Sequence, residues 1–136
     1  MSKYIRIVVP GQPVSKLRQR VTKSGHAYTP EKTVKYENLV KDMWRVYGSE
    51  TLGTKPVEMR IDLRMKIPES ESKKRKELML SGGICHVKKP DADNCAKSIM
   101  DALNGLAYKD DSQIIKLTVE KRYDSDPKAI IHIMEA

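Results

Sequence analysis

The sequence predicts an α+β fold, in which a small, mostly antiparallel sheet packs against two or three helices in one compact domain spanning residues 1–136. Three observations support this class. Several segments alternate apolar and polar residues, which is typical of half-buried strands. Two other segments repeat apolar residues at helical spacing. No internal repeat or low-complexity linker divides the chain, and its length suits a single core.

Four segments are predicted as strands from their alternating apolar residues. The first covers residues 4–9 and the longest covers residues 57–67. Two more strands follow at residues 115–119 and 129–133, joined by a turn at 124–127, and we expect these two to pair in an antiparallel manner. The residues expected to face the core are Ile5, Ile7, Val9, Val57, Met59, Ile61, Leu63, Met65, Ile67, Ile115, Leu117, Val119, Ala129, Ile131 and Ile133.

Helices are predicted between these strands. Thr29 as N-cap and Pro30 at the first helical position open a helix that Gly48 ends. A short charged helix, or a mobile excursion, is expected between Ser70 and Gly82, and an amphipathic helix from about Asp93 to Leu106. Before them, residues 11–28 form a long basic loop or an irregular hairpin.

The chain is strongly basic, with 26 Lys and Arg against 18 Asp and Glu and a net charge of +8. Residues 1–30 carry six basic residues and no acidic one. Because binding of basic side chains to phosphates releases counterions and is therefore favourable, this balance indicates a nucleic-acid partner. Lys16, Arg18 and Arg20 are the candidates for contacts to a nucleic-acid backbone. For each of them, plain solubilising charge is the alternative.

Several classes of protein are excluded by composition. No apolar run approaches the ~20 residues of a membrane helix, and the N-terminus has no signal-peptide core, so we expect a cytoplasmic protein without a membrane partner. Cys85 and Cys95 form neither a disulfide framework nor a zinc site, because zinc needs four N or S ligands. We expect reduced, partly buried thiols.

Five aspartates gather between Lys89 and Ile114 in this basic chain: Asp91, Asp93, Asp101, Asp110 and Asp111. Like charges held together destabilise a site unless a cation neutralises them. The predicted helix places Asp93, Lys97 and Asp101 at i, i+4 and i+8 on one face, at the rim of the core. A chain reversal after this helix could return Asp110 and Asp111 to the same place. Taken singly, each residue could instead be a helix cap, an ion-pair partner or part of a polar turn.

Convergent carboxylates match the needs of phosphodiester hydrolysis. Their hard oxygen atoms suit Mg²⁺ or Mn²⁺, which also bind substrate phosphate. A metal lowers the pKa of bound water and offsets charge in the transition state, and a nearby lysine such as Lys97 adds positive charge beside the scissile phosphate. The residues alone thus suggest a metal-dependent nuclease.

The segments "KPDADNCAKSIMDALNG" and "YKDDSQI" resemble the signature of the RusA family of Holliday junction resolvases. The Asp-x-Asp-Asn, the lysine four residues after the second aspartate, the Asp-Ala-Leu and the later Asp-Asp-x-Gln occur in the same order. "GQPVSKLRQR" and "AYTPEKTVKYE" are similar to the N-terminal part of such proteins from phage and prophage. The resemblance extends over nearly the whole chain.

The resemblance implies a homodimeric, Mg²⁺-dependent endonuclease, with Mn²⁺ as a substitute, that binds four-way DNA junctions and uses no nucleotide cofactor. It implies Asp91, Asp93 and Asp111 as essential acidic residues and metal ligands, and Lys97 as a group acting at the scissile phosphate. Asp110 is a further candidate ligand, and Asp101 is a supporting residue. Cys95 stands where the family commonly has an aliphatic residue.

We therefore expect paired, symmetric nicks in junction DNA during recombination and repair, leaving 5′-phosphate ends. A two-fold dimer suits the near two-fold symmetry of a junction. A nuclease for other branched DNA, such as flaps or forks, is one alternative. A protein that binds branched DNA without cutting it is the other, although carboxylates near phosphates would weaken mere binding.

Overall fold

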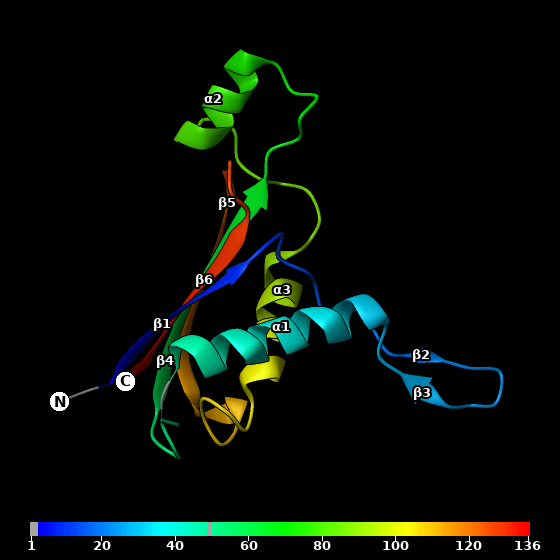
Figure 1. Ribbon diagram of the computed structural model, residues 1–136, viewed down its shortest axis with the longest axis vertical. Coiled ribbons are helices and arrows are strands. Elements are labelled where there is room, and N and C mark those ends of the chain that lie inside the picture. Colours follow the sequence, from blue (N-terminus) through cyan, green and yellow to red (C-terminus); the bar gives the residue numbers. More distant parts are fainter. Residues whose placement is uncertain (1–2, 49) are drawn as a thin grey trace.

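A four-stranded sheet with the strand order β1–β6–β4–β5 forms the centre of the protein (Figure 1). The computed structural model describes residues 3–48 and 50–136. The strands of this sheet are β1 (Tyr4–Pro10), β4 (Val57–Lys66), β5 (Ile114–Asp124) and β6 (Lys128–Glu135). β6 pairs antiparallel with both β1 and β4, whereas β4 and β5 are parallel. The predicted α+β class with a mostly antiparallel sheet is confirmed.

The predicted pairing of the last two strands is wrong, because β4 lies between β5 and β6. β4 alternates fully buried residues such as Met59, Ile61 and Leu63 with more exposed ones along its length. In the centre of the sheet, both edges of β4 find hydrogen-bond partners, β5 on one side and β6 on the other. The turn at residues 125–127 therefore carries the chain across β4.

The described residues form three α-helices beside the sheet: α1 (Glu31–Tyr47), α2 (Lys73–Ser81) and α3 (Ala92–Leu103). α1 begins one residue later than predicted, because Pro30 is the N-cap, and it ends at Gly48 as expected. A Cβ atom on Gly48 would lie 2.6 Å from the ring of Trp44, so only glycine fits this end of the helix.

α2 is the predicted charged helix, capped by Ser72 rather than near Ser70. The Ser72 Oγ accepts a hydrogen bond from the Arg75 backbone N–H at 3.2 Å. The helix ends at Gly82, whose positive φ of 88° is the left-handed conformation that favours glycine. α2 lies beyond one end of the sheet (Figure 1).

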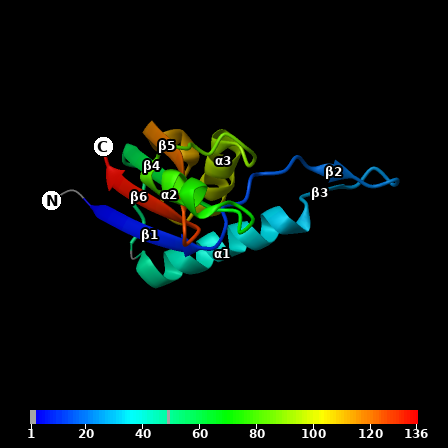
Figure 2. The ribbon, with the colours of Figure 1, turned by 90° about the horizontal axis from the view of Figure 1, so that it is seen from above.

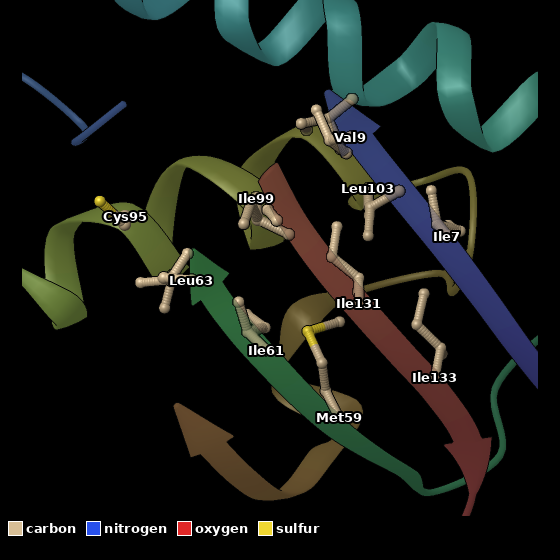
Figure 3. Close-up of a cluster of buried hydrophobic side chains, with 14 of the residues drawn as sticks. Ile7, Val9, Met59, Ile61, Leu63, Cys95, Ile99, Leu103, Ile131 and Ile133 are labelled. Atoms are coloured by element: carbon tan, nitrogen blue, oxygen red, sulfur yellow. The ribbon is translucent and has the colours of Figure 1, made fainter. Parts of the chain in front are cut away.

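The hydrophobic core fills the space between one face of the sheet and helices α1 and α3. α1 contributes Tyr36, Val40 and Trp44, and α3 contributes Ile99 and Leu103. Figure 3 shows side chains of β1, β4 and β6 pointing toward those of α3. Because burial of these apolar side chains drives folding, the core fixes where α3, and thus the aspartate segment, lies on the sheet.

A small hairpin of β2 (Arg20–Val21) and β3 (Ala27–Tyr28) projects from the rest of the protein (Figures 1 and 2). Of the two alternatives predicted for residues 11–28, the hairpin is present at residues 20–28, and a loop precedes it. A short 3₁₀ helix, η1 (Asp111–Gln113), precedes β5. Among the described residues, no helix is long and apolar enough to cross a membrane.

The apolar stripe predicted for β5 is only partly buried. Ile115 and Leu117 are 69% and 42% exposed, whereas Val119 is half-buried. The sequence predicts that the whole stripe faces the core. β5 is instead an edge strand, and α3 leaves its N-terminal half open.

Candidate active site

Four of the predicted site residues line one cleft between α3 and the surface of β5. Asp93, Lys97 and Asp101 come from α3, and Asp111 comes from η1. The remaining walls of this cleft, which measures about 400 Å³, are apolar, and they are formed by Ala92, Ala96, Met100, Leu117 and Val119. The helical spacing of i, i+4 and i+8 thus places three charged side chains on one face, as predicted.

Asp111 reaches the cleft because the segment after α3 folds back and is held in place. The Asp111 backbone N–H donates to Asn104 Oδ1 at 3.1 Å. The Gln113 side-chain amide donates to the carbonyl oxygens of Gly53 and Lys55, at 2.8 and 2.9 Å. These bonds fix η1 between the C-terminal end of α3 and the loop before β4. The predicted chain reversal is present.

Asp110 does not line this cleft and has a structural role instead. Its carboxylate accepts hydrogen bonds from the Ser112 hydroxyl and the Ser112 backbone N–H. Its own backbone N–H donates to Gln113 Oε1 at 2.8 Å, which completes a capping box at η1. The hydrogen bonds from Ser112 hold the pKa of Asp110 below its usual value. The predicted role of Asp110 as a metal ligand stays a prediction, and the capping box competes with it.

Asp91 is the N-cap residue of α3 and lies on the other side of the helix start. Its side chain makes no capping hydrogen bond and is exposed. It borders a neighbouring hollow together with Lys16, Arg18, Lys89 and Asn94. Asp91 and Asp93 therefore flank the first turn of α3, each beside a different depression of the surface.

Lys121 fixes the segment that leads into Asp91. From β5, its ammonium group donates hydrogen bonds to the carbonyl oxygens of Lys88 at 2.9 Å and Pro90 at 3.1 Å. Nothing in the sequence pattern indicated this role, because a lysine on a strand usually reads as a solvated residue. The contact depends on two segments about thirty residues apart meeting in space.

Lys16 is held inside the protein by two carboxylates. Its ammonium group lies 2.5 Å from Glu37 Oε1 and 3.2 Å from Asp101 Oδ2. Partial burial opposes its charge, but the hydrogen bonds to Glu37 and Asp101 prevail and raise the pKa of Lys16. Lys16 thus links α1 to α3, whereas Arg18 and Arg20 keep the predicted role of DNA contacts open. Glu37 was not anticipated.

The base of the β2–β3 hairpin is tied directly to α3. The Lys16 backbone N–H donates to the Asn94 carbonyl at 2.8 Å, and the buried Ser98 hydroxyl donates to the Val14 carbonyl at 2.8 Å. Beyond this base, Arg18, Arg20 and the hairpin residues lie half-exposed or exposed. A basic projection therefore starts beside the acidic residues of α3.

The negative charge at α3 acts on two buried groups. Burial raises the pKa of the Cys95 thiol to about 11; Lys121 opposes this change, and Asp91 and Asp93 add to it. At the other end of the helix, burial raises the pKa of Tyr108, and the charges of Asp111, Asp101 and Asp110 raise it further. Both cysteines are free, as expected. Cys95 is buried, but Cys85 is exposed, so the predicted partial burial of both thiols is wrong for Cys85.

Two carboxylates of the cleft are of a chemical type that could contribute to a divalent-cation site completed by other ligands. In the described part of the chain, no group of three or more His, Cys, Asp or Glu side chains lies close enough together to hold a metal ion. Asp93 and Asp111 nevertheless open onto one cleft and offer hard oxygen ligands. Mg²⁺ is commonly bound by one or two carboxylates, with waters and substrate phosphates completing its shell.

Comparison with known proteins places the chain in a family of nucleases. The family described as "Endodeoxyribonuclease RusA" matches residues 10–134, so the chain belongs to the RusA family. This membership implies an endodeoxyribonuclease that acts on Holliday junctions. The chain is also 37% identical over 136 residues to "Uncharacterized protein YqaN" of Bacillus subtilis (strain 168), and the match covers 96% of both chains. The predicted family is confirmed.

Proposed function

We propose that this protein is a metal-dependent endodeoxyribonuclease that resolves four-way DNA junctions by paired, symmetric nicks. The observation that carries this proposal is the cleft where Asp93, Lys97, Asp101 and Asp111 meet, in a chain of the RusA family. Asp91, Asp93 and Asp111 are the ligands for Mg²⁺. Asp93 and Asp111 open onto the cleft, whereas Asp91 flanks the start of α3 beside a neighbouring depression. Mn²⁺ substitutes, and no nucleotide cofactor takes part.

The reaction is hydrolysis of a phosphodiester. Water attacks the phosphorus atom and the bond to the 3′ oxygen breaks, which leaves a 5′-phosphate and a 3′-hydroxyl. A bound divalent cation would lower the pKa of the attacking water and offset the charge that develops on the phosphate. Lys97 contributes a fixed positive charge beside the same phosphate. Asp101 keeps Lys16 in place next to the cleft.

A homodimer suits this substrate, because two active sites related by a two-fold axis would nick opposing strands of a nearly two-fold junction. Arg18 and Arg20, at the start of the hairpin, are suited to contact the DNA backbone. This activity belongs to recombination and repair in the cytoplasm, and a prophage origin is consistent with it.

A cleavage assay on a mobile four-way junction, a flap and a linear duplex tests the proposal, with Mg²⁺, with Mn²⁺ or with a chelator. We expect cleavage of the junction alone, with metal only, at symmetric positions with 5′-phosphate ends. Preference for the flap would favour a nuclease for other branched DNA. Junction binding without cleavage by the wild-type protein would favour the non-catalytic alternative.

Two variants separate the site from the rest of the surface. Asp93→Asn should abolish cleavage and keep or tighten junction binding, because it removes a carboxylate that repels phosphate. Asp42→Asn is the matched control, since Asp42 is an exposed carboxylate on α1 that pairs with Arg45. Equal cleavage by both variants would contradict the assignment of the cleft.

A further inference from the structure

Strand β5 presents an unpartnered edge beside the candidate active site. Among the described strands it is hydrogen-bonded to β4 alone. Residues 115–118 are all exposed, including the apolar Ile115 and Leu117. β5 is eleven residues long and contains no proline that would block further pairing. A long, partly apolar edge of this kind is a template for another strand.

The sequence of this edge is complementary to itself. When two copies of β5 pair antiparallel about a two-fold axis through Thr118, Lys116 lies opposite Glu120 of the second copy, and Leu117 lies opposite Val119. The opposite charges then meet on one face of the sheet, and the apolar pairs meet on the other face.

Neighbouring registers lack this complementarity. An axis through Leu117 pairs Lys116 with Thr118, and an axis through Val119 sets Lys116 against Arg122, which is a like charge. An axis that passes between two residues is excluded, because it would set side chains that point to opposite faces of the sheet against each other. Lys116 and Glu120 can reach a second copy, because both side chains are more than half exposed. Within the chain, Lys116 lies 3.7 Å from Glu58 and Glu120 lies 3.9 Å from Arg60.

We propose that a second copy of this chain pairs with β5 about an axis at Thr118, so that the two four-stranded sheets become one. The proposal rests on the dimer of the proposed function and gives that dimer an interface. Leu117 and Val119, which line the cleft with Asp93 and Asp111, lie at this interface. The clefts of the two copies consequently open on the same face of the joined sheet.

Charge reversal tests the register. In Lys116→Glu, glutamate faces Glu120 of the second copy at both symmetric positions, and in Glu120→Lys, lysine faces Lys116. We expect each variant to self-associate at least about tenfold more weakly than wild type in sedimentation. An equimolar mixture places opposite charges at both positions, so it should form a heterodimer with nearly wild-type affinity.

The mixture distinguishes the proposed interface from damage within one chain. Each substitution also removes an ion pair inside its own chain, with Glu58 or with Arg60, and a second protein cannot restore that pair. Circular dichroism spectra and melting temperatures close to wild type confirm folding of each variant. Single variants that dimerise like wild type, or a mixture that stays monomeric, would overturn the proposal.

Cross-linking provides a second test. In a Cys85→Ser background, Thr118→Cys places two thiols directly opposite each other, at a Cα separation that a disulfide can span. Oxidation should give a covalent dimer. Lys116→Cys is the matched control, because its counterpart lies several residues away across the axis, and it should stay monomeric. Equal cross-linking of both variants would exclude this register.

These readouts are independent of catalysis. A wild-type protein that dimerises in this manner but does not cut junctions would leave the interface standing and overturn the proposed function. A wild-type protein that cuts junctions while sedimenting as a monomer would overturn the interface.

Discussion

Lys121 and Pro90 are joined by a hydrogen bond of 3.1 Å from the lysine ammonium group to the proline carbonyl oxygen. The same ammonium group binds the carbonyl of Lys88. A strand at the edge of the sheet thus fixes the backbone immediately before Asp91, the N-cap of α3. Since Asp91 has no side-chain capping bond, its position depends on this backbone.

Lys121 is therefore predicted to be a positioning residue for Asp91. Lys121→Met should lower kcat for junction cleavage by ~10–100-fold, which is typical of groups that orient a metal ligand, and should raise the Mg²⁺ concentration needed for half-maximal rate. KM for the junction should change little, because Lys121 is turned toward the protein backbone. Single-turnover and steady-state rates measured across a Mg²⁺ series check this.

Lys121→Arg should restore part of the rate, since a guanidinium group can donate to both carbonyls. Arg122→Met is the matched control on the neighbouring, exposed position of the same strand. If Lys121→Met changed KM alone, the residue would be a DNA contact rather than a positioning residue.

Adjacent aspartates at η1 are predicted to differ in function. Asp111→Asn should abolish cleavage with little change in melting temperature, because Asp111 lines the cleft. Asp110→Ala should lower the melting temperature and leave most of the cleavage rate, because Asp110 accepts the capping bonds from Ser112. Loss of cleavage in Asp110→Ala, with an unchanged melting temperature, would instead make Asp110 a ligand.

The basic residues near the hairpin are predicted to have two different roles: Arg18 and Arg20 contact DNA, and Lys16 stabilises the fold. Arg18→Ala combined with Arg20→Ala should weaken junction binding and reduce the slope of log K against log salt by about 1–2, since each lost phosphate contact lowers it by about one. Lys16→Met should mainly destabilise the protein, by about 1–3 kcal/mol, because it leaves Glu37 and Asp101 without their cation. Fluorescence titrations at several salt concentrations and urea unfolding separate the two effects.

Periodicity was sufficient to predict most elements and the face of α3 that carries the site. Asp93, Lys97 and Asp101 share that face because a helix repeats every 3.6 residues, which is a local property of the chain. The return of Asp111 to the same cleft was open until the structure showed its bond to Asn104.

Non-local pairing accounts for what the sequence did not predict. The placement of β4 between β5 and β6 follows from competition among strands for the centre of the sheet. Glu37 and Lys121 acquire their roles only when α1 and β5 reach α3 and the loop before it. Neither role leaves a periodic signal, since each residue alone has the character of an ordinary surface charge.

His86 gives the last prediction, a dependence of stability on pH. Its ring is buried against Tyr123 in an edge-on arrangement with 5.0 Å between centroids, and within the described structure its Nδ1 atom has no hydrogen-bond partner. Burial, and then the charge of Lys121, lower the pKa of His86 below its ordinary value of 6.5. The unfolded chain therefore binds this proton at a higher pH than the folded protein does.

Between the two pKa values the unfolded state holds more protons, so the free energy of unfolding rises with pH through this window and falls as pH drops below about 6.5. His86→Phe keeps an aromatic ring beside Tyr123 and removes the titration. Urea unfolding from pH 8 to pH 5 should show wild type losing more stability than the variant as pH falls. Because the carboxylates titrate in both proteins, the difference between the two curves isolates His86, and parallel curves would contradict the prediction.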